Sequence, residues 1–337
     1  MIIQLNKNIS KEEKSNITSS LNNISYKTKT VNTQYKNYLI GIGNNDFDIR
    51  KIGNMPGVED IHKVSMDYKL VSRKWRVDDT IIDLGDNISI NRNDLTIMAG
   101  PCSIESEEHA MNIIEHLEEN DIRIMRTMVF KPRSSPYSFR GLGIEGLRTI
   151  SAECKKRNIK IISEVMEVSQ VEAMHDYVDI FQVGTRNTQN FNLLDALGKV
   201  DKAVMIKRGI SGTIDELLQS AEYVFSNGNE KILLCERGIR SFEKSYRNTF
   251  DLNAIPILKD KTHLPVIADP SHSIGIRKHV EKMALAAIMA GADGIITEVH
   301  QQPEKAFSDG QQTLNYPEAK RLYFNAREIN VLKRNLL

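Results

Sequence analysis

Eight short apolar runs recur between residues 95 and 300, from LTIMAG to GIITEVH. Most are unbroken and rich in β-branched residues, which is typical of strands buried on both faces. Stretches with helical length and period, such as KHVEKMALAAIMAG, lie between them. Alternating strands and helices indicate an α/β fold, and eight such units in about 240 residues predict a (β/α)8 TIM barrel over residues 95–337. A doubly wound sheet is the alternative, but AGPCS after the first run lacks its usual glycine fingerprint.

Residues 1–70 show a different pattern. A strand-like MIIQL precedes a helix in KEEKSNITSSLNNI, then two strands, a short helix ending at Gly57, and a last strand in EDIHKVSM. The order β-α-β-β-α-β predicts a small α+β ferredoxin-like domain. We expect residues 71–94 to form a linker and a hairpin that turns at Asp86-Asn87. Nothing in the small domain suggests chemistry, so a capping domain and a regulatory or oligomerising domain are both open at this point.

The composition is that of a globular protein, with 40% hydrophobic and 26% charged residues. The 45 Lys and Arg residues against 44 Asp and Glu residues give a net charge of +1, which argues against a nucleic-acid-binding or membrane-surface protein. The sequence shows no membrane-length apolar segment and no secretion signal at its N-terminus. Three scattered cysteines do not make a disulfide framework, so we expect a reducing cytoplasm.

Polar residues end or follow each of the apolar runs. In a barrel these positions meet at one mouth, where such folds hold their active sites. One polar residue at a strand end is usually a structural hydrogen-bonding group, but a set around the whole barrel indicates a site. The set comprises Cys102, Arg126, Lys131, Glu164, Arg186, Lys207, Arg237, His272, Glu298 and His300.

Cations form the first chemical group at this predicted mouth. They repel one another and lose hydration unless anions balance them. Because arginine forks suit phosphate and carboxylate oxygens, the substrates should carry several negative charges; pairing of single arginines with local Asp or Glu is the alternative. The six cations are Arg126, Lys131, Arg133, Arg186, Lys207 and Arg237.

A thiol, an imidazole and two carboxylates form the second group: Cys102, His272, Glu298 and Asp309. Such a mixed set of donors suits a divalent transition metal, namely Mn, Fe, Co, Zn or Cu. Only the barrel brings these residues together, because they lie far apart in the sequence. The alternatives are a buried apolar role for Cys102 and a simple turn at Asp309.

Longer motifs surround these residues: AGPCS, KPRSSPYSFRGLG, QVGTRNTQN, IKRG, LCERGIRSFE, ADPSHS, and TEVH followed by SDGQQ. Together they resemble the 3-deoxy-D-arabino-heptulosonate 7-phosphate synthases that carry a small ferredoxin-like N-terminal domain. KPRSS is the most specific motif, because the related 3-deoxy-manno-octulosonate 8-phosphate synthases usually carry an Asn-Arg-Ser version. Thr127-Met128, Thr185 and Gln301 depart from the common pattern, and none of them removes a ligand or a cation.

The resemblance implies a reaction. The family condenses phosphoenolpyruvate with erythrose 4-phosphate and water, releases phosphate, and begins the shikimate pathway to the aromatic amino acids. By this resemblance Arg186 and Arg237 hold the phosphate of phosphoenolpyruvate, and Arg126 and Lys207 hold its carboxylate. The alternatives are an octulosonate synthase that uses arabinose 5-phosphate and a non-catalytic phosphosugar-binding sensor.

The resemblance also implies roles for the remaining residues. Arg133, Ser134 and Ser135 bind the sugar phosphate in this scheme. The implied catalytic set is Lys131, close to the reacting atoms, Glu164, close to the attacking water, and His272.

One divalent metal ion per subunit, such as Mn, Fe, Co or Zn, is implied as the cofactor. Its implied ligands are Cys102, His272, Glu298 and Asp309. Relatives further imply a homotetramer and an aromatic amino acid effector that acts through residues 1–70.

Overall fold

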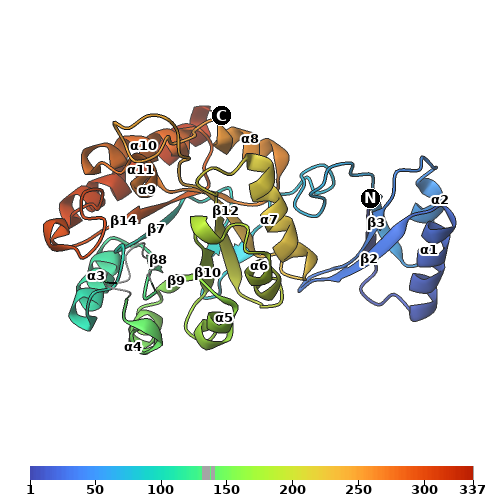
Figure 1. Ribbon diagram of the computed structural model, residues 1–337, viewed down its shortest axis with the longest axis horizontal. Coiled ribbons are helices and arrows are strands. Elements are labelled where there is room, and N and C mark those ends of the chain that lie inside the picture. Colours follow the sequence, from blue (N-terminus) through green and yellow to red (C-terminus); the bar gives the residue numbers. More distant parts are fainter. Residues whose placement is uncertain (131–136, 138–140, 337) are drawn as a thin grey trace.

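The computed structural model describes residues 1–130, 137 and 141–336. Figure 1 shows a barrel surrounded by helices and, beside it, a small domain formed by the N-terminal part of the chain. The predicted fold class is therefore confirmed. None of the helices within the described residues is long and apolar enough to cross a membrane.

The small domain has the predicted order of elements and an antiparallel sheet with strand order β2-β3-β1-β4. Its elements are β1 (Ile2–Leu5), α1 (Lys11–Asn23), β2 (Lys27–Asn32), β3 (Asn37–Ile42), α2 (Arg50–Gly53) and β4 (Val58–His62). Ser10 and Glu13 form a capping box that starts α1. The prediction that the second helix ends at Gly57 was wrong: α2 ends at Gly53, since Pro56 cannot continue a helix and disfavours helical backbone before it. Gly57 lies in the following turn with φ of +87°.

The predicted hairpin is formed by β5 (Ile82–Asp83) and β6 (Ser89–Ile90). Asp86 and Asn87 have φ of 54° and 61°, the left-handed backbone that a tight hairpin turn requires. Ile82 and Ile90 are fully buried and pack with the apolar side chains inside the barrel, including Ile124. The hairpin therefore closes the barrel at the N-terminal ends of its strands.

Eight parallel strands form a closed barrel in which each strand pairs with the next one in the sequence and β14 pairs with β7. The strands are β7 (Thr96–Gly100), β8 (Ile124–Arg126), β9 (Lys160–Val165), β10 (Ile180–Val183), β11 (Ala203–Lys207), β12 (Ile232–Glu236), β13 (Val266–Ala268) and β14 (Gly294–Glu298). All eight correspond to the apolar runs in the sequence, and nearly all of their residues are buried.

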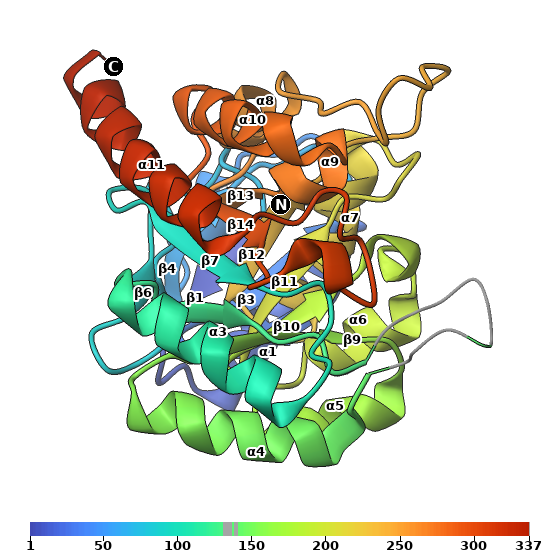
Figure 2. The ribbon, with the colours of Figure 1, turned by 90° about the vertical axis from the view of Figure 1, so that its left-hand side faces the viewer.

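Helices surround the strands, as the end-on view in Figure 2 shows. They are α3 (Glu107–Glu119), α4 (Gly143–Lys156), α5 (Val168–Met174), α6 (Phe191–Leu197), α7 (Ile214–Ser226), α8 (Ala254–Lys261), α9 (Pro270–Ile274), α10 (Arg277–Met289) and α11 (Tyr316–Leu336), with short 3-10 turns at Thr185–Asn187 and Pro303–Lys305. The helices cover the sides of the barrel, and the loops at the C-terminal ends of the strands form the site.

The small domain packs on the opposite end of the barrel, which we call the barrel base. Tyr38 lies edge-on to Trp75 with ring centroids 5.5 Å apart, and Trp75 in turn lies edge-on to His263 at 5.9 Å. Glu230, just before β12, accepts hydrogen bonds from Thr33 and from Tyr38. The segment that the sequence analysis treats as a linker is therefore packed into this contact rather than exposed.

Candidate functional site

A cavity of about 510 Å³ lies at the C-terminal ends of the barrel strands, opposite the barrel base. Side chains from several strand ends line it, as expected for a barrel enzyme. Among the predicted site residues, the lining contains Arg126, Glu164, Arg186, Lys207, Arg237, His272 and Asp309. Cys102 and Glu298 are buried close to this lining, since Cys102 lies against Asp309 and Glu298 against Arg126.

Arg126 ends β8 and is only 1% exposed. Its Nη2 lies 3.2 Å from Oε1 of Glu298, while its Nε and Nη1 have no hydrogen-bond partner among the described residues. Burial alone would lower the pKa of Arg126, but the nearby Glu298 and Cys102 raise it, so the side chain stays charged. Buried donors without acceptors are costly, and an anion in the cavity would satisfy them.

Asp269 is fully buried and organises two predicted residues. It accepts hydrogen bonds from the Lys207 ammonium and, at 2.8 Å, from Nδ1 of His272. Burial would raise the pKa of Asp269, but the facing His272 and Lys207 hold it well below its usual range. Burial lowers the pKa of His272 to about 4, so the ring is neutral at pH 7. With a proton on Nδ1, the His272 ring offers the lone pair of Nε2 to the site, the tautomer that a metal-binding histidine needs.

Three of the four predicted metal ligands lie together, and the fourth, His272, lies next to one of them. Ligand atoms of Cys102, Glu298 and Asp309 all lie within 4.8 Å of one another. Cys102 Sγ is 3.2 Å from Asp309 Oδ2, and His272 Nε2 is 3.2 Å from Glu298 Oε1. Two carboxylates and a thiol held this closely repel once they ionise, unless a cation lies between them. The donor set therefore fits a divalent transition metal.

Arg186 and Arg237 differ from Arg126 and Lys207, because neither forms an ion pair with a carboxylate within the described part of the chain. Arg237 is 6% exposed, and the hydrogen bond found for its side chain goes to the carbonyl of Gly238 at 3.2 Å. Burial lowers the pKa of Arg237. Internal pairing with carboxylates thus holds for Arg126 and Lys207, whereas Arg186 and Arg237 line the cavity without an ion pair among the described residues.

Glu164 on β9 also faces the cavity. Nε2 of Gln182 lies 3.4 Å from its Oε2. A Cβ atom at Gly184 would lie 2.0 Å from Oε1 of Glu164, so glycine at this position leaves the room that the carboxylate occupies. Glu164 is therefore held in place at the edge of the cavity.

The predicted residues Lys131, Arg133, Ser134 and Ser135 lie outside the described residues. Sequence reasoning missed Arg240 and Arg247, which both line the cavity from the loop after β12. Their position shortly after Arg237 in the same loop was the available signal. Gln182 was missed as well, because a glutamine inside an apolar strand carries no pattern of its own.

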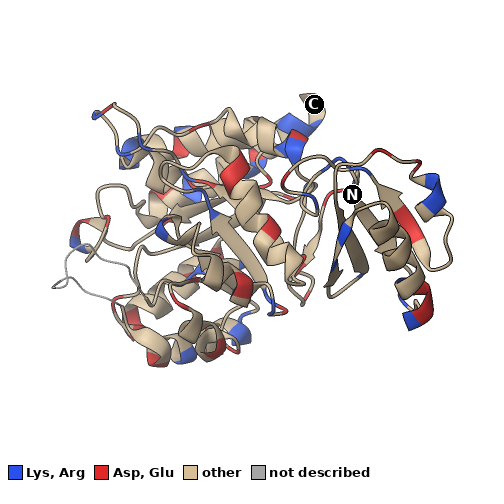
Figure 3. Ribbon diagram, turned by 45° about the vertical axis from the view of Figure 1, so that its right-hand side comes forward, with Lys and Arg blue, Asp and Glu red and all other residues tan. Residues whose placement is uncertain are grey.

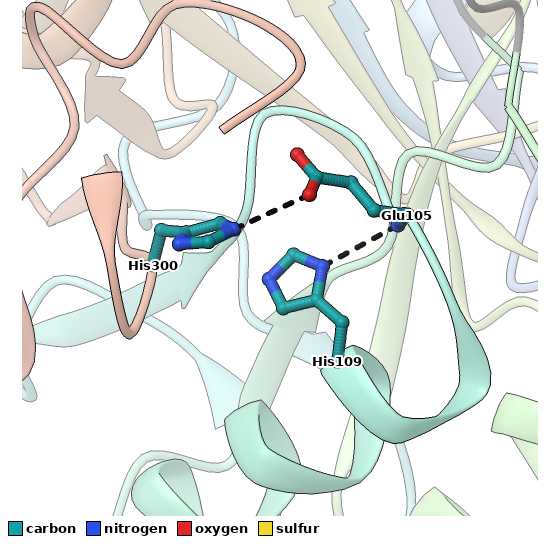
Figure 4. Close-up of side chains that lie close together, drawn as sticks. All are labelled: Glu105, His109 and His300. Atoms are coloured by element: carbon teal, nitrogen blue, oxygen red, sulfur yellow. Dashed lines mark hydrogen bonds and ion pairs between the residues drawn. The ribbon is translucent and has the colours of Figure 1, made fainter. Parts of the chain in front are cut away.

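A second group of ligand types lies nearby, formed by Glu105, His109 and His300 (Figure 4). Nδ1 of His109 accepts the backbone N–H of Glu105 at 3.3 Å, and Nδ1 of His300 accepts that of Gln302 at 2.9 Å. In a neutral imidazole the other nitrogen, Nε2, then carries the proton and cannot bind a metal. Burial lowers the pKa of His109 to about 4, so that ring is neutral. Glu105 also accepts the N–H of Phe307 at 2.6 Å. The group thus ties the loop after β7 to the loop after β14.

Comparisons with known proteins identify the family of the chain. The model of the DAHP synthetase I family matches residues 79–333. A phospho-2-dehydro-3-deoxyheptonate aldolase from Thermotoga maritima is 46% identical over 272 residues, covering 81% of this chain and 80% of that protein. A 2-dehydro-3-deoxyphosphooctonate aldolase from Syntrophobacter fumaroxidans is 33% identical, covering 68% of this chain and 85% of that protein.

Solved structures give the same result. The crystal structure of the Thermotoga maritima aldolase, a DAHP synthase, aligns with 98% of this chain and 98% of its own at a TM-score of 0.78 and 40% identity. A truncated form of 3-deoxy-D-arabino-heptulosonate 7-phosphate synthase from the same organism aligns with 79% of this chain and 98% of its own, at a TM-score of 0.73 and 42% identity. The barrel fold, the residues at its mouth and these matches together show that the chain belongs to the DAHP synthetase I family.

Proposed function

We propose that the barrel mouth condenses phosphoenolpyruvate with erythrose 4-phosphate and water to form 3-deoxy-D-arabino-heptulosonate 7-phosphate and phosphate. The observation that carries this proposal is the pairing of two features in one cavity. Cationic side chains line the cavity, one of them, Arg126, with two donors that lack a partner among the described residues, and they lie next to a compact set of metal-ligand types. A reaction between two phosphorylated anions needs the first feature, and activation of an aldehyde is served by the second.

Arg186 and Arg237 are the proposed ligands of the phosphate of phosphoenolpyruvate, because their charges are free to be balanced by it. Arg126 and Lys207 are proposed to hold its carboxylate, with the open Nε and Nη1 donors of Arg126 as the natural contact. Arg133, Ser134 and Ser135, with Lys131 beside them, are proposed for the sugar phosphate from the KPRSS motif. Binding both anions side by side supplies the entropic part of catalysis.

Cys102, His272, Glu298 and Asp309 are the residues that would hold one divalent ion, such as Mn, Fe, Co or Zn. When bound, such an ion supplies Lewis acidity toward the aldehyde oxygen of the sugar. Asp269 keeps the proton of His272 on Nδ1, so that Nε2 remains a ligand. Glu164 is proposed to orient the water that adds to the second carbon of phosphoenolpyruvate.

The octulosonate synthase is the second candidate, because relatives with that name are also more than 30% identical. The KPRSS motif and the 46% identity with the heptonate enzyme favour the four-carbon sugar. The deciding experiment incubates the protein and phosphoenolpyruvate with erythrose 4-phosphate or with arabinose 5-phosphate, with and without a chelator, and identifies the product. A better rate with arabinose 5-phosphate overturns the proposal, and absence of turnover with both sugars favours the binding sensor.

Residues 1–70 are proposed to regulate rather than to catalyse, within a cytoplasmic homotetramer. None of them lines the cavity at the mouth. An aromatic amino acid effector would have to bind one arrangement of the small domains better than another to change activity. Full-length protein should be inhibited by tyrosine or phenylalanine, and protein lacking residues 1–70 should be active but insensitive. Truncated protein that folds but is inactive would contradict this division of labour.

A further inference from the structure

The loop between β12 and α8 lies across two of the segments that carry the proposed metal ligands. The N–H of Arg247 donates to the carbonyl of Ile274 at 3.2 Å, and the N–H of Asn248 donates to that of Ser273 at 2.9 Å. The side-chain amide of Asn248 donates to the carbonyl of His272 at 2.9 Å. The backbone of this loop is thus fixed to the short helix α9, which carries His272.

The side chain of Arg247 extends from this fixed backbone to the loop that carries Asp309. Its Nη1 donates to Oδ1 of Asp309 at 3.2 Å and to Oε1 of Gln312 at 2.6 Å. Gln312 is fully buried, and its Nε2 donates to Oε2 of Glu298 at 2.6 Å. Arg247 therefore contacts one proposed ligand directly and reaches a second through a single amide.

These contacts also orient the Asp309 carboxylate. Arg247 occupies Oδ1, and Oδ2 is the oxygen that lies 3.2 Å from Cys102 Sγ. Asp309 has φ of 53°, a left-handed backbone that a residue other than glycine adopts only when its surroundings hold it there. Gly275 provides space for the arginine stem, because a Cβ atom at Gly275 would lie 2.4 Å from Cβ of Arg247.

We propose that Arg247 is a positioning residue, which holds Asp309 and, through Gln312, Glu298 in the arrangement that binds the metal ion. This inference rests on the proposed metal site. It concerns a residue outside the four ligands and outside the cations assigned to the substrates. Partners that orient metal ligands typically account for about ten- to hundred-fold in metal affinity.

Whether loss of Arg247 weakens or tightens metal binding distinguishes a positioning role from a purely electrostatic one. A cation close to a divalent ion repels it, so loss of a charge that only lines the cavity should tighten metal binding or leave it unchanged. If Arg247 orients the ligands, its loss should weaken metal binding despite the relief of repulsion. Arg240 is the matched control, because it lines the same cavity from the same loop but contacts no proposed ligand among the described residues.

The experiment titrates metal-stripped, full-length protein with Mn²⁺ and measures the free ion by electron paramagnetic resonance, so that the bound ion is obtained as total minus free Mn²⁺. We expect Arg247→Met to weaken Mn²⁺ binding about ten- to hundred-fold. Arg247→Lys, which keeps the charge and one donor group, should recover part of that loss. Arg240→Met should bind Mn²⁺ as tightly as the wild type or more tightly. Thermal unfolding of each variant checks its fold, and Arg247→Lys carries the test if Arg247→Met does not fold.

Two results would overturn the inference, and they are distinguishable. If the wild type binds Mn²⁺ and Arg247→Met binds it equally well or better, Arg247 has no positioning role and the metal site remains supported. If the wild type binds no metal at the four ligands, the proposed metal site is wrong, and so is the positioning role that depends on it.

Discussion

The barrel mouth and the barrel base both bury charged side chains, but they differ in how those charges are satisfied. At the base, Glu230 is nearly fully buried and is contacted by Arg76 at 3.2 Å as well as by the hydroxyls of Thr33 and Tyr38. At the mouth, Arg126 is equally buried, yet two of its nitrogens have no partner among the described residues. Burial of a charge therefore does not by itself mark a functional site. The informative feature is a buried charge whose hydrogen-bonding capacity is left open.

In the small domain, by contrast, charged side chains remain exposed to solvent. Figure 3 shows basic and acidic residues close together on its ribbon. Lys63 and Asp46 lie 2.7 Å apart, as do Arg50 and Asp48, and all of these side chains except the half-buried Asp48 are largely exposed. Exposed pairs of this kind contribute little to stability and carry no functional signal.

The largest expected effect comes from removing a ligand at the mouth. Cys102→Ala deletes the thiol beside Asp309, so turnover should fall about a thousand-fold or more, because the metal chemistry is worth several kcal/mol. The thermal unfolding midpoint should change little, because a barrel of this size does not depend on one thiol. Chelation of the wild type should have the same effect, and added Mn²⁺ should restore only the wild type. Full turnover by the variant or by metal-free protein would contradict the metal site.

A smaller loss is expected when one open cation is removed. Arg186→Met should raise KM for phosphoenolpyruvate about ten- to hundred-fold, which corresponds to one charge-assisted contact. The KM for erythrose 4-phosphate should change much less. Steady-state kinetics with each substrate varied in turn provides the measurement. A rise confined to the KM of the sugar phosphate would mean that the two anion sites are assigned the wrong way round.

At the base, we expect an effect on stability rather than on activity. Burial and the nearby Arg76 lower the pKa of His263 to about 3, while its two nitrogens bond to Thr80 and to the carbonyl of Leu70. An unfolded histidine has a pKa of about 6.5, so between pH 6.5 and 3 the unfolded state binds a proton that the folded state does not. Stability should therefore fall with decreasing pH in this window, and the loss from this residue between pH 7 and 5 is about 2 kcal/mol.

The measurement compares urea unfolding of the wild type and of His263→Gln at pH 7 and pH 5. The variant should be less stable at pH 7 but should lose about 2 kcal/mol less on acidification. Equal losses in the two proteins would show that His263 is not the group that takes up the proton. Activity at pH 7 should be the same, since His263 lies on the side of the barrel away from the cavity.

The sequence was sufficient for the barrel because the strands are buried on both faces and therefore read as unbroken apolar runs. The location of the site could be predicted for a related reason: strand ends converge in a barrel, which brings Cys102 and Asp309 together from opposite ends of the domain. The closure of the barrel base by Ile82 and Ile90 was not predictable, since where a two-residue strand docks depends on tertiary packing alone. Arg247 and Gln312 were missed because loop residues have no period, and their roles depend on hydrogen bonds that only the folded chain shows.

The smallest effect is expected from an arginine of the small domain that is exposed, as Arg186 is. Arg50 contacts Asp48, and its side chain is 81% exposed. Arg50→Ala should leave kcat, both KM values and the unfolding midpoint unchanged within error, because water replaces its hydrogen bonds and salt screens its charge. The measurement sets Arg50→Ala beside Arg186→Met in the same assays. If Arg50→Ala raised the KM for phosphoenolpyruvate as much as Arg186→Met does, the loss would reflect net charge rather than the mouth. The proposed difference between the cations without ion pairs at the mouth and the solvated ion pairs of the small domain would then be wrong.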